Sequence, residues 1–115
     1  MEIKNFLDQL YTLFSPIDYV VDIVILNQTR TSIKVRIHLF NNNYITVYYN
    51  SYRGTQSFSL MQSNKRIWGL DFDNRIGWHK HPVTNPDSHI KTNKVTLNDM
   101  LRKLDDLLNN DFTGK

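Results

Sequence analysis

Hydrophobic residues recur every three or four positions at both ends of the chain, which is the spacing of an amphipathic helix. The first such stretch covers residues 2–14 and stops before Pro16, because the residue that precedes a proline is disfavoured in helical backbone. The second begins after Thr96, a good N-cap residue, and Asp99 completes a capping box with it. The chain is therefore expected to begin and end with a helix.

Between the two helices, hydrophobic and polar residues alternate with a period of two, which is typical of strands with one buried face. The predicted strands cover residues 19–27, 33–39, 44–51, 56–62 and 67–74. Short turns join them and leave no room for a crossover helix, so the sheet is predicted to be an antiparallel meander.

We therefore expect one α+β domain over residues 1–115, with a five-stranded antiparallel meander sheet. The N-terminal and C-terminal helices should pack on one face of the sheet. The opposite face should be cationic, since Lys34 and Arg36 alternate with buried positions of the second strand.

Composition narrows the class of protein. The chain has no cysteine, which excludes disulfides and thiolate metal sites. It has neither a run of about 20 apolar residues nor a signal-peptide pattern, so a cytoplasmic protein without a membrane span is expected. The segment from Arg30 to Lys94 holds ten Lys and Arg against three Asp, a charge of +7. A basic sheet suits nucleic acid, although a solvated basic face is common in small domains.

The predicted last strand is followed by about twenty residues, 75–95, that are expected to be a loop because Gly77, Pro82 and Pro86 interrupt any regular pattern. Loops of this length are usually functional or disordered. This one holds three of the four histidines, namely His79, His81 and His89.

One hypothesis for this loop is a metal site. In an extended segment, His79 and His81 would point to the same side, and His89 could supply a third ligand. Asp71 and Asp73 share one face of the preceding strand and could add a carboxylate; the candidate metal ligands are His79, His81, His89 and Asp71. Three nitrogens and an open position suit zinc, whereas a His and Asp mixture suits manganese or iron. A divalent transition metal is thus the candidate cofactor.

A second hypothesis is metal-free acid–base cleavage of RNA, since histidine exchanges protons near neutral pH. The three histidines would supply the acid and the base. Cations could hold the phosphate, and aromatic rings could stack on bases. The residues considered for these contacts are Arg66, Arg75, Lys80, Trp68 and Trp78. A third hypothesis is a recognition surface for a protein partner, without catalysis.

Several segments match a known family in order and spacing. They are residues 57–62, 65–68, 71–74, His79-x-His81-Pro82, Pro86 and His89. This pattern, which covers residues 57–90, resembles the TumE-like toxins of prokaryotic toxin–antitoxin modules. It departs from theirs in lacking adjacent histidine pairs.

The resemblance implies a small toxin that a helix-turn-helix antitoxin inhibits, and it carries over Asp73, Asn74 and the three histidines as site residues. The candidate catalytic set is therefore His79, His81, His89 and Asp73, and Asn74 joins the candidate substrate contacts. A toxin-like protein that acts on RNA is the leading expectation. A non-enzymatic module that binds nucleic acid or protein, a metal-dependent hydrolase and a homodimeric assembly remain open alternatives.

Overall fold

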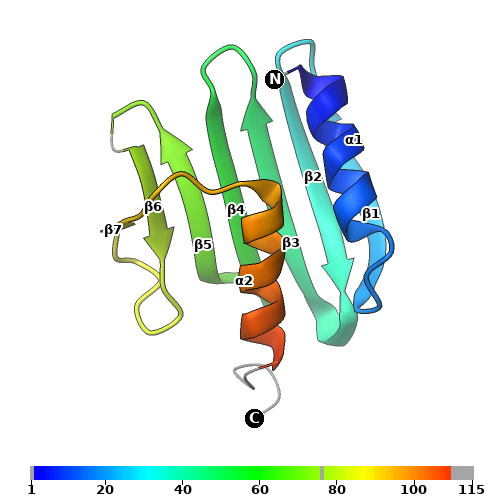
Figure 1. Ribbon diagram of the computed structural model, residues 1–115. Coiled ribbons are helices and arrows are strands. Elements are labelled where there is room, and N and C mark those ends of the chain that lie inside the picture. The colour runs from blue at the N-terminus through cyan, green and yellow to red at the C-terminus, as the bar shows by residue number, and fades with distance from the viewer. Residues whose placement is uncertain (1, 76, 110–115) are drawn as a thin grey trace.

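The computed structural model describes residues 2–75 and 77–109. Two helices and seven strands follow one another along the chain (Figure 1). Their bounds are α1 Ile3–Phe14, β1 Val20–Gln28, β2 Ser32–Leu39, β3 Asn43–Asn50, β4 Thr55–Gln62, β5 Lys65–Asp73, β6 Gly77–His81, β7 Ile90–Lys91 and α2 Leu97–Asn109; a single 3-10 turn, η1, covers Phe40–Asn42.

All seven strands belong to one antiparallel sheet in which each strand pairs with its neighbours in the sequence, from β1 to β7. The meander, the two helices and the α+β class are thus confirmed. The predicted number of five strands is wrong, because β6 and β7 lie in the segment expected to be a loop. Period-two hydrophobicity is absent there: β6 alternates Trp78 and Lys80 with two histidines, and β7 has only two residues.

Both helices lie on the same side of the sheet and enclose one core with it (Figure 1). Ile3, Phe6, Leu10 and Phe14 of α1 are buried there, as are Leu97, Met100 and Leu104 of α2. The ring of Phe6 stacks on that of Tyr49 in β3, with centroids 4.4 Å apart. The sheet adds alternate residues of its central strands, namely Ile33, Val35, Ile37, Leu39, Ile45, Val47, Phe58, Leu60, Trp68 and Leu70.

The start of α2 has the capping box that its sequence indicates. The backbone N–H of Asp99 donates to Thr96 Oγ1 and that of Thr96 donates to Asp99 Oδ2, both over 3.1 Å. The hydrogen bond from the Thr96 backbone is the main reason why the pKa of Asp99 lies below its ordinary value. In the described part of the chain, neither helix is long and apolar enough to cross a membrane.

The other face of the sheet, which we call the helix-free face, carries the side chains that alternate with the core. Residues directly opposite each other in antiparallel strands share a face. The pairing therefore places two rows of side chains across this face. The first row runs Lys34, Tyr48, Ser57, Asp71, His79 and Lys91, and the second runs Arg36, Thr46, Ser59, Gly69 and His81.

Candidate metal centre

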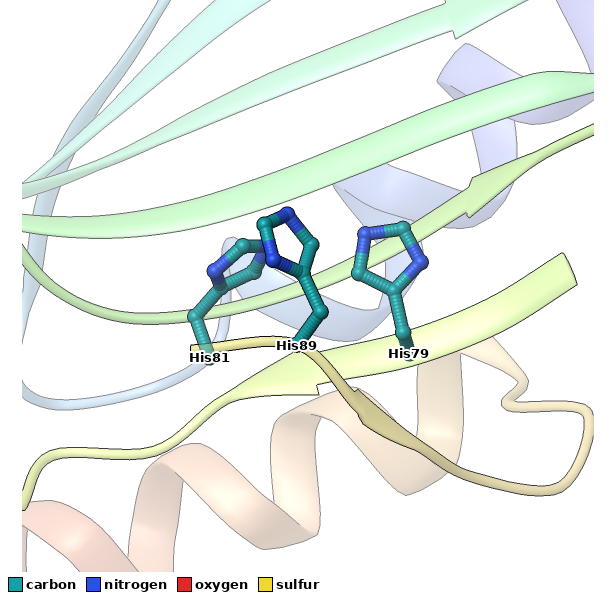
Figure 2. Close-up of side chains that lie close together, drawn as sticks. All are labelled: His79, His81 and His89. Atoms are coloured by element: carbon teal, nitrogen blue, oxygen red, sulfur yellow. The ribbon is translucent and has the colours of Figure 1, made fainter. Parts of the chain in front are cut away.

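Two histidines of β6 and one carboxylate of β5 meet on the helix-free face. His79 is directly opposite Asp71, and His81 follows two residues later, so both rings project to the same side as the carboxylate. The three histidine rings lie close together (Figure 2), with His89 coming from the segment that precedes β7. Asp71 and His89, which are 18 positions apart in the sequence, thus belong to one cluster with His79 and His81.

The backbone fixes which ring nitrogen of each buried histidine carries the proton. Nδ1 of His79 lies 3.1 Å from the carbonyl oxygen of Gly77, and Nδ1 of His81 lies 2.8 Å from that of Pro86. Since a carbonyl oxygen only accepts hydrogen bonds, Nδ1 of each ring carries a proton. Each ring turns its Nε2 toward the carboxylate of Asp71. A carbonyl on the remote nitrogen is also the usual way in which metal-ligating histidines are oriented.

Asp71 is held with one oxygen occupied and the other directed at the histidines. Its Oδ1 accepts hydrogen bonds from Arg66 Nη2 and from Ser57 Oγ, each at 2.8 Å. Its Oδ2 lies 3.1 Å from Nε2 of His81 and 3.6 Å from Nε2 of His79. Two ring nitrogens and a carboxylate oxygen at these distances can be bridged by a proton or by a metal cation. This arrangement is therefore suited to a metal ion.

Burial disfavours protonation of His81 and so favours a metal ion as the cation that binds there. His79 and His81 are 3% and 5% exposed although no helix covers this face. Burial lowers the pKa of His81 below its ordinary value, and the charge of Arg66 lowers it further, against the opposite effects of the Pro86 carbonyl and Asp71. The lowered pKa favours the neutral ring, which is the form that binds a metal.

His89 stands at the exposed mouth of the site. The segment from Pro82 to His89 folds back through two turns, in which Asn85 N–H donates to Pro82 O and Ser88 N–H donates to Asn85 O. This brings the His89 ring to 4.6 Å from that of His81 and 5.1 Å from that of His79, measured between centroids. His89 itself is exposed. It can therefore close the site with a third nitrogen ligand.

The separations fit one ion. Among the described residues, the three histidines are the one group of His, Cys, Asp or Glu whose ligand atoms all lie within 4.8 Å of one another. Two ligands of a tetrahedral ion with bonds of about 2.0–2.1 Å are roughly 3.3 Å apart. The 3.1 and 3.6 Å between Asp71 Oδ2 and the two Nε2 atoms bracket that value. The ligand atom of His89 lies within 4.8 Å of those of His79 and His81.

Gly69 makes room for the arginine that orients Asp71. A Cβ atom at Gly69 would lie 2.0 Å from Arg66 Nη2 and 2.5 Å from Arg66 Cζ. The guanidinium thus occupies the space above Gly69 and reaches the carboxylate from there. Ser57 and Gly69 were both missed from the sequence. A glycine inside a strand pattern was the available signal, since it often marks a close approach.

The other predicted site residues lie elsewhere. At the turn between β5 and β6, Oδ1 of Asp73 accepts from the backbone N–H of Arg75, and Nδ2 of Asn74 donates to the Arg53 carbonyl. Asp71, and not the predicted catalytic Asp73, is the carboxylate that contacts His79 and His81.

Three predicted substrate contacts lie on the helix side of the sheet. Trp68 is 3% exposed in the core, and the ring of Trp78 packs on Phe72, with centroids 5.3 Å apart. Lys80 is opposite Leu70 and lines a cavity of about 220 Å³ with residues of α2, including Lys103. Arg66 is the predicted substrate contact that the structure places beside the histidines.

Comparison of the chain with protein-family models, with curated proteins and with solved structures finds no match.

Proposed function

We propose that the chain is a metal-dependent hydrolase with its centre at His79, His81, His89 and Asp71. The observation that carries this proposal is the convergence of the Nε2 atoms of His79 and His81 on Asp71 Oδ2, with both Nδ1 atoms next to backbone carbonyls. Backbone carbonyls that fix the orientation of two histidine rings in this way are typical of histidines that bind a metal ion.

The types of ligand at the site indicate which ions it would bind. Nitrogen and carboxylate ligands suit zinc, manganese and iron. His79, His81, His89 and Asp71 would hold such an ion. The ion would supply a bound water of lowered pKa, about 7, as the nucleophile for ester hydrolysis near neutral pH. The guanidinium of Arg66, 2.8 Å from Asp71 Oδ1, would hold that carboxylate in place as a ligand.

The test uses protein without a histidine tag, freed of metal by a chelator. We expect it to bind close to one equivalent of Zn²⁺ or Mn²⁺, and to hydrolyse a chromogenic phosphodiester only after metal is restored. His79→Gln and His81→Gln should lose both properties. His38→Gln is the matched control, because His38 lies on the same face in β2 but outside the site.

Two results would overturn the proposal. If the chelated protein hydrolyses the ester as fast as the metal-loaded protein, the histidines act as metal-free acid and base. If His38→Gln weakens metal binding as much as His79→Gln does, the ions bind to histidines in general and no centre exists.

A toxin role is the second candidate, and the position of the histidines favours it. The three histidines that the resemblance to TumE-like toxins carries over, His79, His81 and His89, are the three whose rings lie together. On this proposal, hydrolysis of RNA in the cytoplasm arrests growth, and a helix-turn-helix antitoxin blocks it. Induced expression should arrest growth for the parent and for His38→Gln, but not for His81→Gln. Equal arrest by all three would leave a non-enzymatic binding module as the better account.

A further inference from the structure

The helix-free face continues from the metal centre across the sheet, and the side chains of its two rows are all polar. We propose that it binds a single-stranded nucleic acid, which crosses β2 to β6 with its phosphates on Lys34 and Arg36 and one phosphodiester at the centre. This inference rests on the proposed hydrolytic function and names its substrate class.

The two rows of side chains give the path. From Asp71 the first row continues through Ser57 and Tyr48 to Lys34, and the second continues from Gly69 through Ser59 and Thr46 to Arg36. Four strand spacings of about 4.8 Å separate β6 from β2, so the path is roughly 19 Å long. That length accommodates about five stacked nucleotides at about 3.4 Å each.

The charge of the path complements phosphate. Lys34 and Arg36 lie at one end and Lys91, opposite His79, lies at the other. In the described part of the chain these three cations make no ion pair, so they are available to an anionic ligand. The one carboxylate of the two rows is Asp71, which Arg66 already neutralises.

Two tyrosines add flat surfaces beside these cations. Tyr48 stands in the first row, and Tyr44 lies under the Arg36 guanidinium, 4.4 Å from its ring centroid. Both side chains are half-buried, and their pairing with β2 places both on the helix-free face. Bases of single strands stack on such rings and on arginine planes. Aromatic rings interleaved with cations favour nucleic acid over an acidic protein as the occupant.

The experiment measures binding without cleavage. Fluorescence anisotropy follows labelled ten-nucleotide RNA and DNA of one sequence added to chelated, metal-free protein at several salt concentrations. The test variant is Lys34→Gln/Arg36→Gln. The matched control is Arg102→Gln/Lys103→Gln, which removes the same charge from α2 on the opposite side of the sheet.

We expect the test variant to weaken binding at least about tenfold at low salt, and the control to change it by less than about twofold. The slope of log K against log salt should become shallower by about 1.4, since each lost phosphate contact removes about 0.7 for a single strand. Tyr48→Ala should weaken binding about fivefold or more, and Tyr48→Phe should retain it, because the stacking ring is kept. A preference for RNA or for DNA identifies the sugar of the substrate.

Equal losses in the test and control variants would overturn the proposal, as would tighter binding of poly-glutamate than of either oligonucleotide, which would indicate an acidic protein partner. Zn²⁺ titration of Lys34→Gln/Arg36→Gln should match that of the parent. Failure of the metal centre would appear in that titration, and failure of the nucleic-acid path would appear in the anisotropy, so the two are distinguishable.

Discussion

Adding a single methyl group to the sheet, by Gly69→Ala, should disable the metal centre without unfolding the protein. The new Cβ would lie 2.0 Å from Arg66 Nη2, so the guanidinium must leave its place above residue 69. The atoms it meets are the far end of a flexible side chain, and Gly69 has no positive φ that alanine would strain. Asp71 then loses the charged one of the two donors that hold its Oδ1 and keeps the hydroxyl of Ser57.

We expect Gly69→Ala to reduce the free energy of unfolding only slightly and the metal affinity strongly. A hydrogen bond to a charged group contributes about 1.5–3 kcal/mol. Partial exposure of the pair, 28% and 18%, screens this to about 1–2 kcal/mol. Replacing a strand glycine by alanine returns about 0.5–1 kcal/mol of backbone entropy. The free energy of unfolding should therefore fall by only about 1 kcal/mol. Metal affinity should fall about 10- to 100-fold, the usual cost of losing an outer partner of a ligand.

Calorimetric Zn²⁺ titration and urea unfolding of Gly69→Ala, Arg66→Ala and the double variant form a cycle that checks this mechanism. If alanine acts by displacing Arg66, Gly69→Ala should cost nothing further in the Arg66→Ala background. Ser59→Thr, which adds a methyl group at the next position of the same row, should leave metal affinity unchanged. Additive losses in the cycle, or unchanged Zn²⁺ affinity in Gly69→Ala, would refute the reasoning.

Three further predictions concern the fold. Thr96→Ala should reduce the free energy of unfolding by about 1 kcal/mol at pH 7 through loss of the cap, which urea unfolding would measure. Because the pKa of Asp99 is lowered in the folded protein, its contribution is complete above its ordinary pKa of 3.8 and is lost as the pH falls through the lowered value. NMR titration should show this pKa rising only part of the way toward 3.8 in Thr96→Ala, because alanine removes the side-chain hydroxyl and keeps the backbone N–H that is the larger cause; an unchanged value would contradict the capping box. Phe6→Ala should cost about 3–5 kcal/mol, whereas Tyr52→Ala, at a side chain that is 85% exposed, should cost less than about 0.5 kcal/mol; comparable losses would contradict the assigned core.

Much of the fold could be predicted because the apolar residues of its core recur along the sequence with the spacing of helices or of strands. The proline at residue 16 and the Thr96 cap mark the end of one helix and the start of the other, and β2 to β5 show alternation with apolar residues on the helix side. β6 could not be recognised in this way. One of its faces carries His79 and His81 and the other carries Trp78 and Lys80, so neither face is uniformly apolar. β7, with two residues, has too little pattern for any period to show.

The site could be predicted only in part, since it depends on strand register. The sequence places His79 and His81 on one side of an extended segment, and the structure has both rings on that side. Asp71 and Asp73 share a face, so alternation alone cannot choose between them. The pairing of Asp71 with His79 makes the choice, and that pairing depends on the tight turn before Gly77, whose φ is positive.

The close approach of Arg66 to Gly69 could also not be predicted from the sequence. Arg66 reaches it because the pairing of β4 and β5 shifts by one residue between Leu60 and Met61, which sets Arg66 opposite Met61. Such a bulge has no distinct signal in a single sequence. The orientation of Asp71 is therefore a property of the folded sheet.

X-ray absorption at the zinc edge, on tag-free protein loaded with one equivalent of Zn²⁺, tests the central claim most directly. The metal centre predicts imidazole nitrogens from His79, His81 and His89 and one oxygen of Asp71 as neighbours, at about 2.0–2.2 Å. The imidazole signal should fall in His81→Gln and remain in His38→Gln. A spectrum with water oxygens as the only neighbours, or one that His81→Gln leaves unchanged, would contradict it.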